Sequence, residues 1–516
     1  MKRIILLTAV GLLLAALAAA DGLCEGWLYE VTEKGLVITG FDGPIPEAAI
    51  PPELDGYRVT GIAREAFAGR AELRRLVVPE GVTFIEAEAF RGCVGLSEIE
   101  FNAVNCAIPP VWIYGGDRNY GVFSGAGASS PDGLRVTFGD RVAVIPAFLF
   151  DTASTGEYGH DGQPCAYVTV VRMSGGVKRV DERAFVGCRD LRAIEFGAAV
   201  QSVGPYAFWQ CTALTGADFD DALLTIEEGA FSGDAALMAV TFGNRLTDIG
   251  AGAFRDCAAL EALELVNPLS TIGENAFRDC AALSRVTIPE TLNELGANAF
   301  YGCVNLAEVN FRAKHCAVPE VWIYGSHGNL GVFSGAGSAA PGGLKVEFGE
   351  KVAEVPAHLF DTASIEEYGH TGEPYAYLTE ARFNDGVRSV GEYAFRGCLD
   401  LETAIFFGAD AEIAEGAFDG CNAVNFHFVC PDGGAIARFA DDAGIAHEAL
   451  SADGGRAWTC KNGHVGNTGN FCIECGAARP EAAACPACGA AFSEGQGYRF
   501  CPWCGAPLNG KDRAGE

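Results

Sequence analysis

The sequence predicts a mainly β solenoid followed by a small cysteine-rich module. An Ala-Phe pair recurs every 23 residues and ends at Phe185, Phe208, Phe231, Phe254, Phe277 and Phe300. A Cys stands three residues after each of these Phe residues, except that Asp234 occupies the position in one unit, and a Leu follows three residues later. Apolar residues at a fixed phase of a fixed repeat indicate units that bury their apolar faces against their neighbours.

Length and charge fit a long repeat protein. The chain has 516 residues, 67 of them Gly, and a net charge of −31. The glycines suit many tight turns, and the length suits a solenoid with a small appendage. An acidic body repels phosphate backbones, so we expect no nucleic-acid partner for the solenoid, and self-repulsion favours a monomer.

The N-terminus has the pattern of a secretory signal. Lys2 and Arg3 precede an apolar run, residues 4–20, that closes on three Ala residues. A positive start, a short apolar core and small residues at the end predict a signal peptide at 1–20, cleaved after Ala20. The alternative is a retained membrane anchor, but 17 apolar residues are at the lower limit for a span. We therefore expect a secreted or cell-surface protein without a membrane span after cleavage.

The solenoid is expected over residues 21–450, with a loose capping turn up to about Gly61. The regular step is interrupted twice, by segments 101–185 and 311–395, which match each other at 50 of 85 positions without a gap. Both contain Val-Trp-Ile-Tyr-Gly and Leu-Phe-Asp-Thr-Ala-Ser. These duplicated segments are predicted to be ordinary turns of the solenoid that carry insertions.

Each turn is expected to contain a short strand. The Leu-x-x-Val-x-Ile segments alternate and are β-branched, which predicts strands that stack in parallel and in register. The Ile-x-x-x-Ala-Phe segment is expected to be the returning half, either strand-like or a tight turn. Residues 433–442 predict a short amphipathic helix, with Ile436, Phe439 and Ala440 inward, that caps the rod. Residues 451–457 are expected to be a linker.

The repeat unit Ile-x-x-x-Ala-Phe-x-x-Cys-x-x-Leu-x-x-Val-x-Ile-Pro, as it stands from Ile272 to Pro289, resembles the BspA-type leucine-rich repeat of bacterial surface proteins. The entry segment from Ile50 to Ile62, which leads into Phe67, is similar to the first turn of that family. The resemblance implies a leucine-rich-repeat solenoid that acts as an extracellular recognition scaffold and is not an enzyme. An enzyme that uses the duplicated segments is the less favoured alternative.

Residues 458–508 resemble a double zinc ribbon. Eight ligand-type residues form two sets of four: Cys460, His464, Cys472 and Cys475, then Cys485, Cys488, Cys501 and Cys504. A Cys-x-x-Cys-Gly knuckle lets two thiolates hold one ion, and two knuckles complete a tetrahedral Zn²⁺ site. His464 stands where the ribbon usually has a Cys. The sequence therefore predicts two structural zinc ions, with disulfide bonds as the alternative in a secreted protein.

A zinc site with four protein ligands leaves no open position for a substrate, so these sites are predicted to be structural. From Arg456 onward the tail carries six basic and five acidic residues. This near-neutral charge favours docking of a partner protein over nucleic acid. One alternative reading makes the ribbon the docking module and the solenoid a spacer.

Four aromatic residues of the duplicated segments are the candidate ligand contacts: Trp112, Tyr114, Trp322 and Tyr324. Amphipathic aromatic side chains dominate recognition surfaces, and the alternative is that they pin each insertion to the rod. The expected partner is a protein or glycan on a cell surface, captured at two equal sites. The solvent column Glu195, Asp218, Thr241, Glu264, Thr287 and Asn310 is acidic or small, which suits a basic or carbohydrate partner.

Two further sequence patterns are interpreted as structural features rather than as functional sites. The Cys column is expected to fill one layer of the core as small apolar side chains. Asp151, Glu157, Tyr158 and His160 recur as Asp361, Glu367, Tyr368 and His370. We expect these to be turn residues reused in a surface loop rather than a cation or acid–base site.

Overall fold

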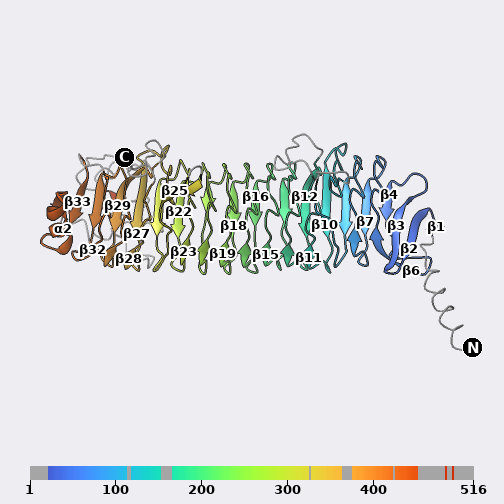
Figure 1. The fold of residues 1–516 in the computed structure, drawn as a ribbon, viewed down its shortest axis with the longest axis horizontal. Coiled ribbons are helices and arrows are strands. Elements are labelled where there is room, and N and C mark those ends of the chain that lie inside the picture. Colours follow the sequence, from blue (N-terminus) through green and yellow to red (C-terminus); the bar gives the residue numbers. More distant parts are fainter. Residues whose placement is uncertain are drawn as a thin grey trace, which may run out of the picture.

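The computed structural model describes residues 21–450, apart from 113–117, 153–164, 325–326, 363–374 and 422–424. It also describes two short strands in the tail, β35 (Ala483–Ala484) and β36 (Ala491–Phe492), which pair antiparallel. The predicted signal peptide, the linker and the eight zinc ligands lie outside the described residues. Residues 21–450 form an elongated rod (Figure 1).

Most coils of the rod contribute a long strand and a two-residue short strand. The long strands stack in parallel in three successive sheets, and the short strands stack in parallel in two, with β8 paired to β6 (Figure 1). Each set is called a ladder below. The long-strand ladder consists of β4 (Glu47–Ala49), β7 (Arg75–Val78), β9 (Glu98–Phe101), β10 (Leu134–Phe138), β12 (Val168–Met173), β14 (Ala193–Glu195), β16 (Gly216–Asp218), β18 (Ala239–Thr241), β20 (Ala262–Leu263), β22 (Arg285–Ile288), β24 (Glu308–Phe311), β27 (Leu344–Phe348), β29 (Leu378–Phe383), β31 (Thr403–Phe406), β33 (His427–Cys430) and β34 (Ala446–Ala449). The short-strand ladder consists of β8 (Phe84–Ile85), β11 (Val144–Ile145), β13 (Arg179–Val180), β15 (Ser202–Val203), β17 (Thr225–Ile226), β19 (Asp248–Ile249), β21 (Thr271–Ile272), β23 (Glu294–Leu295), β28 (Glu354–Val355), β30 (Ser389–Val390) and β32 (Glu412–Ile413).

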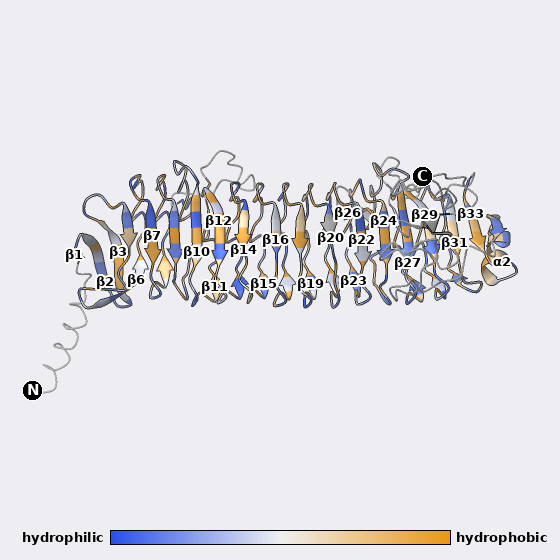
Figure 2. Cartoon of the chain, turned by 180° about the vertical axis from the view of Figure 1, so that it is seen from behind, coloured by the Kyte–Doolittle hydropathy of each residue, from blue (hydrophilic) through white to orange (hydrophobic). Residues whose placement is uncertain are grey.

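The pairing confirms parallel, in-register strands. Val240 pairs with Ala217 of the coil before and Leu263 of the coil after, which keeps the 23-residue step. Along β10 buried and exposed residues alternate, because successive side chains of a strand point to opposite faces. Figure 2 shows both apolar and polar segments on the long strands. The returning half is strand-like for two residues and then a tight turn through Ala-Phe, so both predicted forms occur.

A column of Phe rings forms the centre of the rod. Fourteen rings stack in thirteen steps, with centroids 4.8–5.5 Å apart, from Phe67 to Phe418. Phe123 and Phe333 belong to this column. Both stand in the sequence Gly-Val-Phe-Ser-Gly-Ala-Gly, which the two duplicated segments share. Each duplicated segment therefore continues the solenoid, as predicted, and contributes coils that the sequence pattern alone did not show.

The Cys column is part of the core, as predicted. The thiols are free. Six of them donate a hydrogen bond to a carbonyl of the preceding coil: Cys211, Cys257, Cys280, Cys303, Cys398 and Cys421. Cys257 Sγ donates to the Phe231 carbonyl at 3.2 Å, and Cys280 Sγ donates to the Phe254 carbonyl at 3.2 Å. A small side chain that also donates one hydrogen bond satisfies a buried carbonyl and fills the layer.

Both ends of the rod are capped. At the N-terminal end, β1 (Asp21–Cys24), β2 (Trp27–Thr32) and β3 (Gly35–Phe41) form an antiparallel meander, β6 (Tyr57–Ile62) joins in parallel, and β5 (Glu53–Leu54) pairs with β6. At the other end, α2 (Ala435–Ala443) buries Ile436 and Ala440, and Phe439 packs against the core. The predicted capping helix is thus confirmed.

Candidate binding grooves beside the duplicated hairpins

A groove lies where each duplicated segment leaves the short-strand ladder. Ala107 bridges to Phe84, and Ala317 bridges to Glu294, but each bridge is isolated because the chain then turns outward at a proline. The ladder resumes only at β11 and β28, in separate sheets. Because the chain leaves the ladder at this point, the short strand of the preceding coil is not covered by a next strand. The groove lies along this uncovered edge.

The two grooves occupy equivalent positions in the two copies. The N-groove is lined by residues 64, 84–87, 107–109, 112 and 119. The C-groove is lined by residues 271–275, 278, 294–298, 317–319 and 329. Residues 64, 84–87, 107–109 and 119 each have their counterpart 210 positions later. The N-groove encloses about 480 Å³ and the C-groove about 830 Å³.

Beside each groove the chain returns to the rod through a hairpin base. In the second copy this base is a strand pair, β25 (Trp322–Tyr324) with β26 (His327–Asn329). In the first copy Trp112 and Asn119 exchange two backbone hydrogen bonds, of 3.1 and 2.8 Å. The base of the hairpin is therefore built the same way in both copies.

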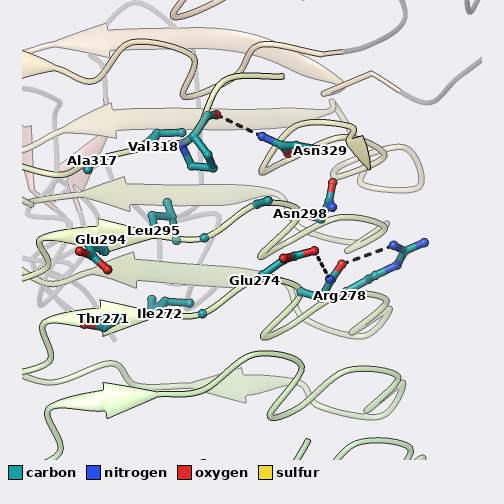
Figure 3. Close-up of a pocket in the computed structure, with 15 residues that line it drawn as sticks. Thr271, Ile272, Glu274, Arg278, Glu294, Leu295, Asn298, Ala317, Val318 and Asn329 are labelled. Atoms are coloured by element: carbon teal, nitrogen blue, oxygen red, sulfur yellow. Dashed lines mark hydrogen bonds between the residues drawn. The ribbon is translucent and has the colours of Figure 1, made fainter. Parts of the chain in front are cut away.

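A buried asparagine holds each hairpin base. Asn119 is 1% exposed, donates its side-chain amide to the Pro110 carbonyl at 2.8 Å and accepts from the Gly121 amide at 2.9 Å. Asn329 is also 1% exposed and repeats both contacts, with the carbonyl of Glu320 at 2.7 Å and the amide of Gly331 at 3.0 Å. Figure 3 shows Asn329 with a further hydrogen bond that it donates to the Pro319 carbonyl, at 3.1 Å, beside Val318.

The role of these asparagines was not predicted from the sequence. The available signal was their presence in both copies at the point where the hairpin returns.

Of the four candidate aromatic residues, the structure places one side chain. Trp112 lines the N-groove and is 37% exposed. Tyr114 lies outside the described residues. For Trp322 and Tyr324 the backbone lies in β25, and their side chains are outside the described part of the structure.

Asp151 and Asp361, considered above as residues of a surface loop, are fully buried. Arg183 Nε donates to Asp151 at 2.9 Å. Arg396 donates two hydrogen bonds to Asp361, of 2.8 and 2.7 Å, and His358 Nδ1 lies 2.7 Å from the same carboxylate. The prediction of a surface loop is therefore wrong for these two residues, because each carboxylate neutralises a buried arginine. Their recurring partners His160 and His370 are outside the described residues.

The solvent column of the long-strand ladder is as predicted over most of its length. Glu195, Asp218, Thr241 and Glu264 are exposed. Asn310 differs, because it is only 8% exposed and donates its amide to Glu308 at 3.3 Å. Part of the charge is also internally compensated, since Arg172 pairs with Glu195 at 2.9 Å. The negative electrostatic potential of this face is therefore weaker than its carboxylates alone would suggest.

The two thiols beside the grooves are poorly suited to react or to bind a metal ion. Burial raises the pKa of Cys106 and of Cys316, the cysteines beside the two grooves, to about 12. A thiol with such a pKa carries almost no thiolate at neutral pH and is a poor nucleophile or metal ligand. In the part of the chain that the structure describes, no cluster of His, Cys, Asp and Glu residues could hold a metal ion.

The two parallel ladders and the stacked Phe column define a leucine-rich-repeat solenoid. The sequence model of the BspA type leucine-rich repeat region matches six copies, over residues 58–109, 163–263, 202–326 and 364–431. These ranges cover more than half of the chain, and the protein therefore belongs to the BspA-type leucine-rich repeat family. None of the curated proteins matches it.

Solved leucine-rich-repeat structures resemble the rod at low sequence identity. A leucine-rich repeat protein from Bacteroides ovatus is 19% identical, covering 84% of this chain and all of its own, with a TM-score of 0.47. A leucine-rich cell surface protein from Faecalibacterium prausnitzii is 18% identical, covering 82% and 97%, with a TM-score of 0.37. The pneumococcal vaccine antigen PcpA is 12% identical, covering 84% and 98%, with a TM-score of 0.33.

Within the described residues, no helix combines the length and the apolar character needed to cross a bilayer.

Proposed function

We propose that this protein is a non-catalytic recognition scaffold of the cell surface or the secreted space. It binds a protein or glycan through the N-groove and the C-groove, with Trp112, Tyr114, Trp322 and Tyr324 as aromatic contacts. Leucine-rich-repeat proteins are generally scaffolds of this kind, because a stack of repeats presents an extended binding surface. The predicted signal peptide, cleaved after Ala20, supports the location.

The exposure of Trp112 carries the proposal. If the tryptophan only pinned the insertion to the rod, we would expect it to be buried and the base of the hairpin to depend on it. The base is instead held by buried Asn119, and Trp112 remains 37% exposed at the rim of the N-groove. A large amphipathic ring that the fold leaves half exposed beside a groove is suited to contact a ligand.

Two grooves on one rod support bivalent capture. Eight ring-to-ring steps of 4.9–5.4 Å separate Phe90 from Phe300, so the grooves lie about 40 Å apart along the rod, at the spacing of stacked strands. A surface that presents ligands at this separation can engage both. The second contact then benefits from a high effective concentration.

The test is capture of the fluorescently labelled chain by a panel of bacterial and host cells, read by flow cytometry. We expect Trp112→Ala or Trp322→Ala alone to weaken capture modestly and the double variant to lose far more, because avidity requires both sites. Met238→Ala is the matched control, since it removes a side chain that is 49% exposed but outside both grooves. A double variant that is folded by circular dichroism and captured as well as wild type would refute this use of the tryptophans.

We propose in addition that residues 458–508 form the double zinc ribbon, with two structural Zn²⁺ ions on the eight ligands named above, and that this module docks a partner. One observation favours it. Strands β35 and β36 pair antiparallel, and the six residues that join them include Cys485, Cys488 and Gly489. A Cys-x-x-Cys-Gly sequence between two paired strands is typical of a zinc ribbon. Deletion of residues 456–516, followed by the same capture assay, separates a docking role of the tail from a docking role of the rod.

A further inference from the structure

The two duplicated segments differ on the outer face of the long-strand ladder. In the second copy one row of outward side chains runs in register across β24, β27, β29 and β31, and it consists of Asn310, Glu347, Arg382 and Ile405. The equivalent row of the first copy, across β9, β10, β12 and β14, consists of Glu100, Thr137, Arg172 and Glu195. The four strands of the second row lie side by side near the C-terminal end of the rod (Figure 2).

The second row is more buried than the first, although the strands are equivalent. Thr137, Arg172 and Glu195 are exposed, whereas all four residues of the second row are buried or half-buried. The arginine that both rows share shows the difference directly, because the side chain of Arg172 is 58% exposed and that of Arg382 is 35% exposed. Outward side chains of a strand at the surface are expected to face water. The second row is therefore less accessible to water than its position on the sheet predicts.

Asn310 provides an independent sign that a contact belongs on this face. It is 8% exposed, and its side-chain amide donates to Glu308 at 3.3 Å. Its Oδ1 is buried and has no hydrogen-bond partner in the part of the chain that the structure describes. Buried polar atoms are nearly always paired, because an unpaired one is costly. A hydrogen-bond donor is therefore expected above Asn310.

The neighbouring carboxylate is also withdrawn from water. Burial is the largest cause of the raised pKa of Glu347, and it outweighs the opposing effect of Arg382, the next residue of the row. A carboxylate on a fully solvated sheet face would not lose this hydration. The desolvated area thus extends from Asn310 to the adjacent strand.

The length of the chain beyond β34 indicates which segment can reach this row. β34 ends at Ala449 and is the last strand of the same seven-stranded sheet, four strands from β27 and five from β24. At the spacing of stacked strands this separation is about 19–24 Å, and the seven residues of the predicted linker, 451–457, can span about 23–25 Å. The nearest strand of the first row, β14, is ten strands away in the long-strand ladder. That distance is about 48 Å, beyond the reach of the linker.

We infer that the tail, residues 451–516, folds back on the rod and covers the outer face of β24, β27, β29 and β31. A polar group of the tail donates the hydrogen bond that Asn310 Oδ1 lacks. This inference is separate from the proposed capture at the grooves, because no residue that lines either groove belongs to these strands. The outer face of the rod is then the first partner of the tail, and any external partner of the tail competes with it.

The few lysines of the chain allow a direct test by amine-reactive cross-linking of the full chain, followed by peptide mass spectrometry. Lys461 belongs to the tail, and Lys345 is exposed on the outer face of β27. Lys34 and Lys178 are exposed in the N-terminal half of the chain. We expect Lys461 to be joined to Lys345 and not to Lys34 or Lys178.

A second pair of lysines provides an internal reference. Lys314 and Lys351 both bond to Glu290, at 3.1 and 2.9 Å, so they are close together in the folded rod. The yield of the Lys461–Lys345 cross-link is measured relative to the Lys314–Lys351 cross-link. A variant that fails to fold loses the reference and is recognised in this way.

The groups of the second row are tested by giving them the residues of the first. The variant Asn310→Glu/Glu347→Thr has the residues that stand at these two positions in the first copy. We expect it to lower the relative yield of the Lys461–Lys345 cross-link about tenfold, as for the loss of one buried polar contact. The matched control is Arg135→Lys, which places a lysine at the position of the first copy equivalent to Lys345. No cross-link from this lysine to Lys461 is expected.

A cross-link of Lys461 to Lys345 that the double variant weakens supports the inference. Equal linking of Lys461 to Lys345 and to Lys178, an unchanged relative yield in the double variant, or no link to Lys345 while the reference forms would overturn it. A mixture of isotopically light and heavy chains identifies the remaining case, because mixed pairs would show that a second copy supplies the tail and would also overturn the inference. The capture assay with Trp112→Ala/Trp322→Ala does not depend on these outcomes, so failure of one proposal is distinguishable from failure of the other.

Discussion

Replacing Asp234 by Cys should stabilise the rod. Among the six regular repeats from Phe185 to Phe300, this is the one in which Asp occupies the Cys position. The carboxylate is 0% exposed, and its Oδ1 accepts a hydrogen bond from the Cys211 amide at 2.7 Å. Its Oδ2 is buried without a hydrogen-bond partner. At the equivalent position of the next coil, the Cys257 thiol donates to the carbonyl of Phe231. The corresponding carbonyl for position 234 is that of Phe208, which a new thiol would reach.

The magnitude follows from this unsatisfied oxygen. A buried polar atom without a partner costs about 1–3 kcal/mol, so we expect Asp234→Cys to raise the free energy of unfolding at pH 7 by about 1–3 kcal/mol. Urea unfolding of residues 21–450, followed by far-UV circular dichroism, measures it. A decrease in stability of the variant would refute the reasoning.

The pH dependence gives a second readout. Burial raises the pKa of Asp234 well above its ordinary value, so the folded state holds this proton where the unfolded state, with an ordinary pKa of about 3.9, has released it. The wild type should therefore lose stability as the pH rises from about 4 through the raised folded pKa. The neutral variants Asp234→Cys and Asp234→Asn should lack this slope. An identical slope in wild type and Asp234→Asn would show that Asp234 does not titrate as proposed.

Two more outcomes are expected. Phe254→Ala should destabilise the rod by about 3–5 kcal/mol, because its ring stacks on Phe231 and Phe277 at 5.4 Å on both sides. The same change at Phe67, in a terminal turn, should cost less stability. Equal losses of stability at the two sites in urea unfolding would contradict coupling between neighbouring turns. The fragment of residues 456–516, purified under reducing conditions, should contain two zinc ions by native mass spectrometry and lose its structure with a chelator; a metal-free fragment with four disulfides would favour the alternative.

The repeat itself was predictable from the sequence. A fixed step of 23 residues places Phe, Cys and Leu at one phase, and burial of those residues requires that identical coils stack in register. The β-branched segments gave the strands, and the pattern of Ile436, Phe439 and Ala440 gave the capping helix. These features depend on local spacing, which the sequence records directly. For the same reason the duplicated segments could be matched to each other before any coordinates were known.

The positions of the grooves could not be predicted from residue spacing, because the grooves form where the pairing of strands stops. Whether Ala107 and Ala317 continue a ladder or end it depends on the path of the chain after each proline, and only the fold fixes that path. Likewise, the sequence placed Asp151 in a loop, whereas the fold buries it against Arg183, 32 residues later. The sequence by itself determined the repeat, the strands and the candidate aromatic residues. The tertiary structure decided which side chains meet across coils, because contacts between residues distant in the chain depend on the closed geometry of each coil.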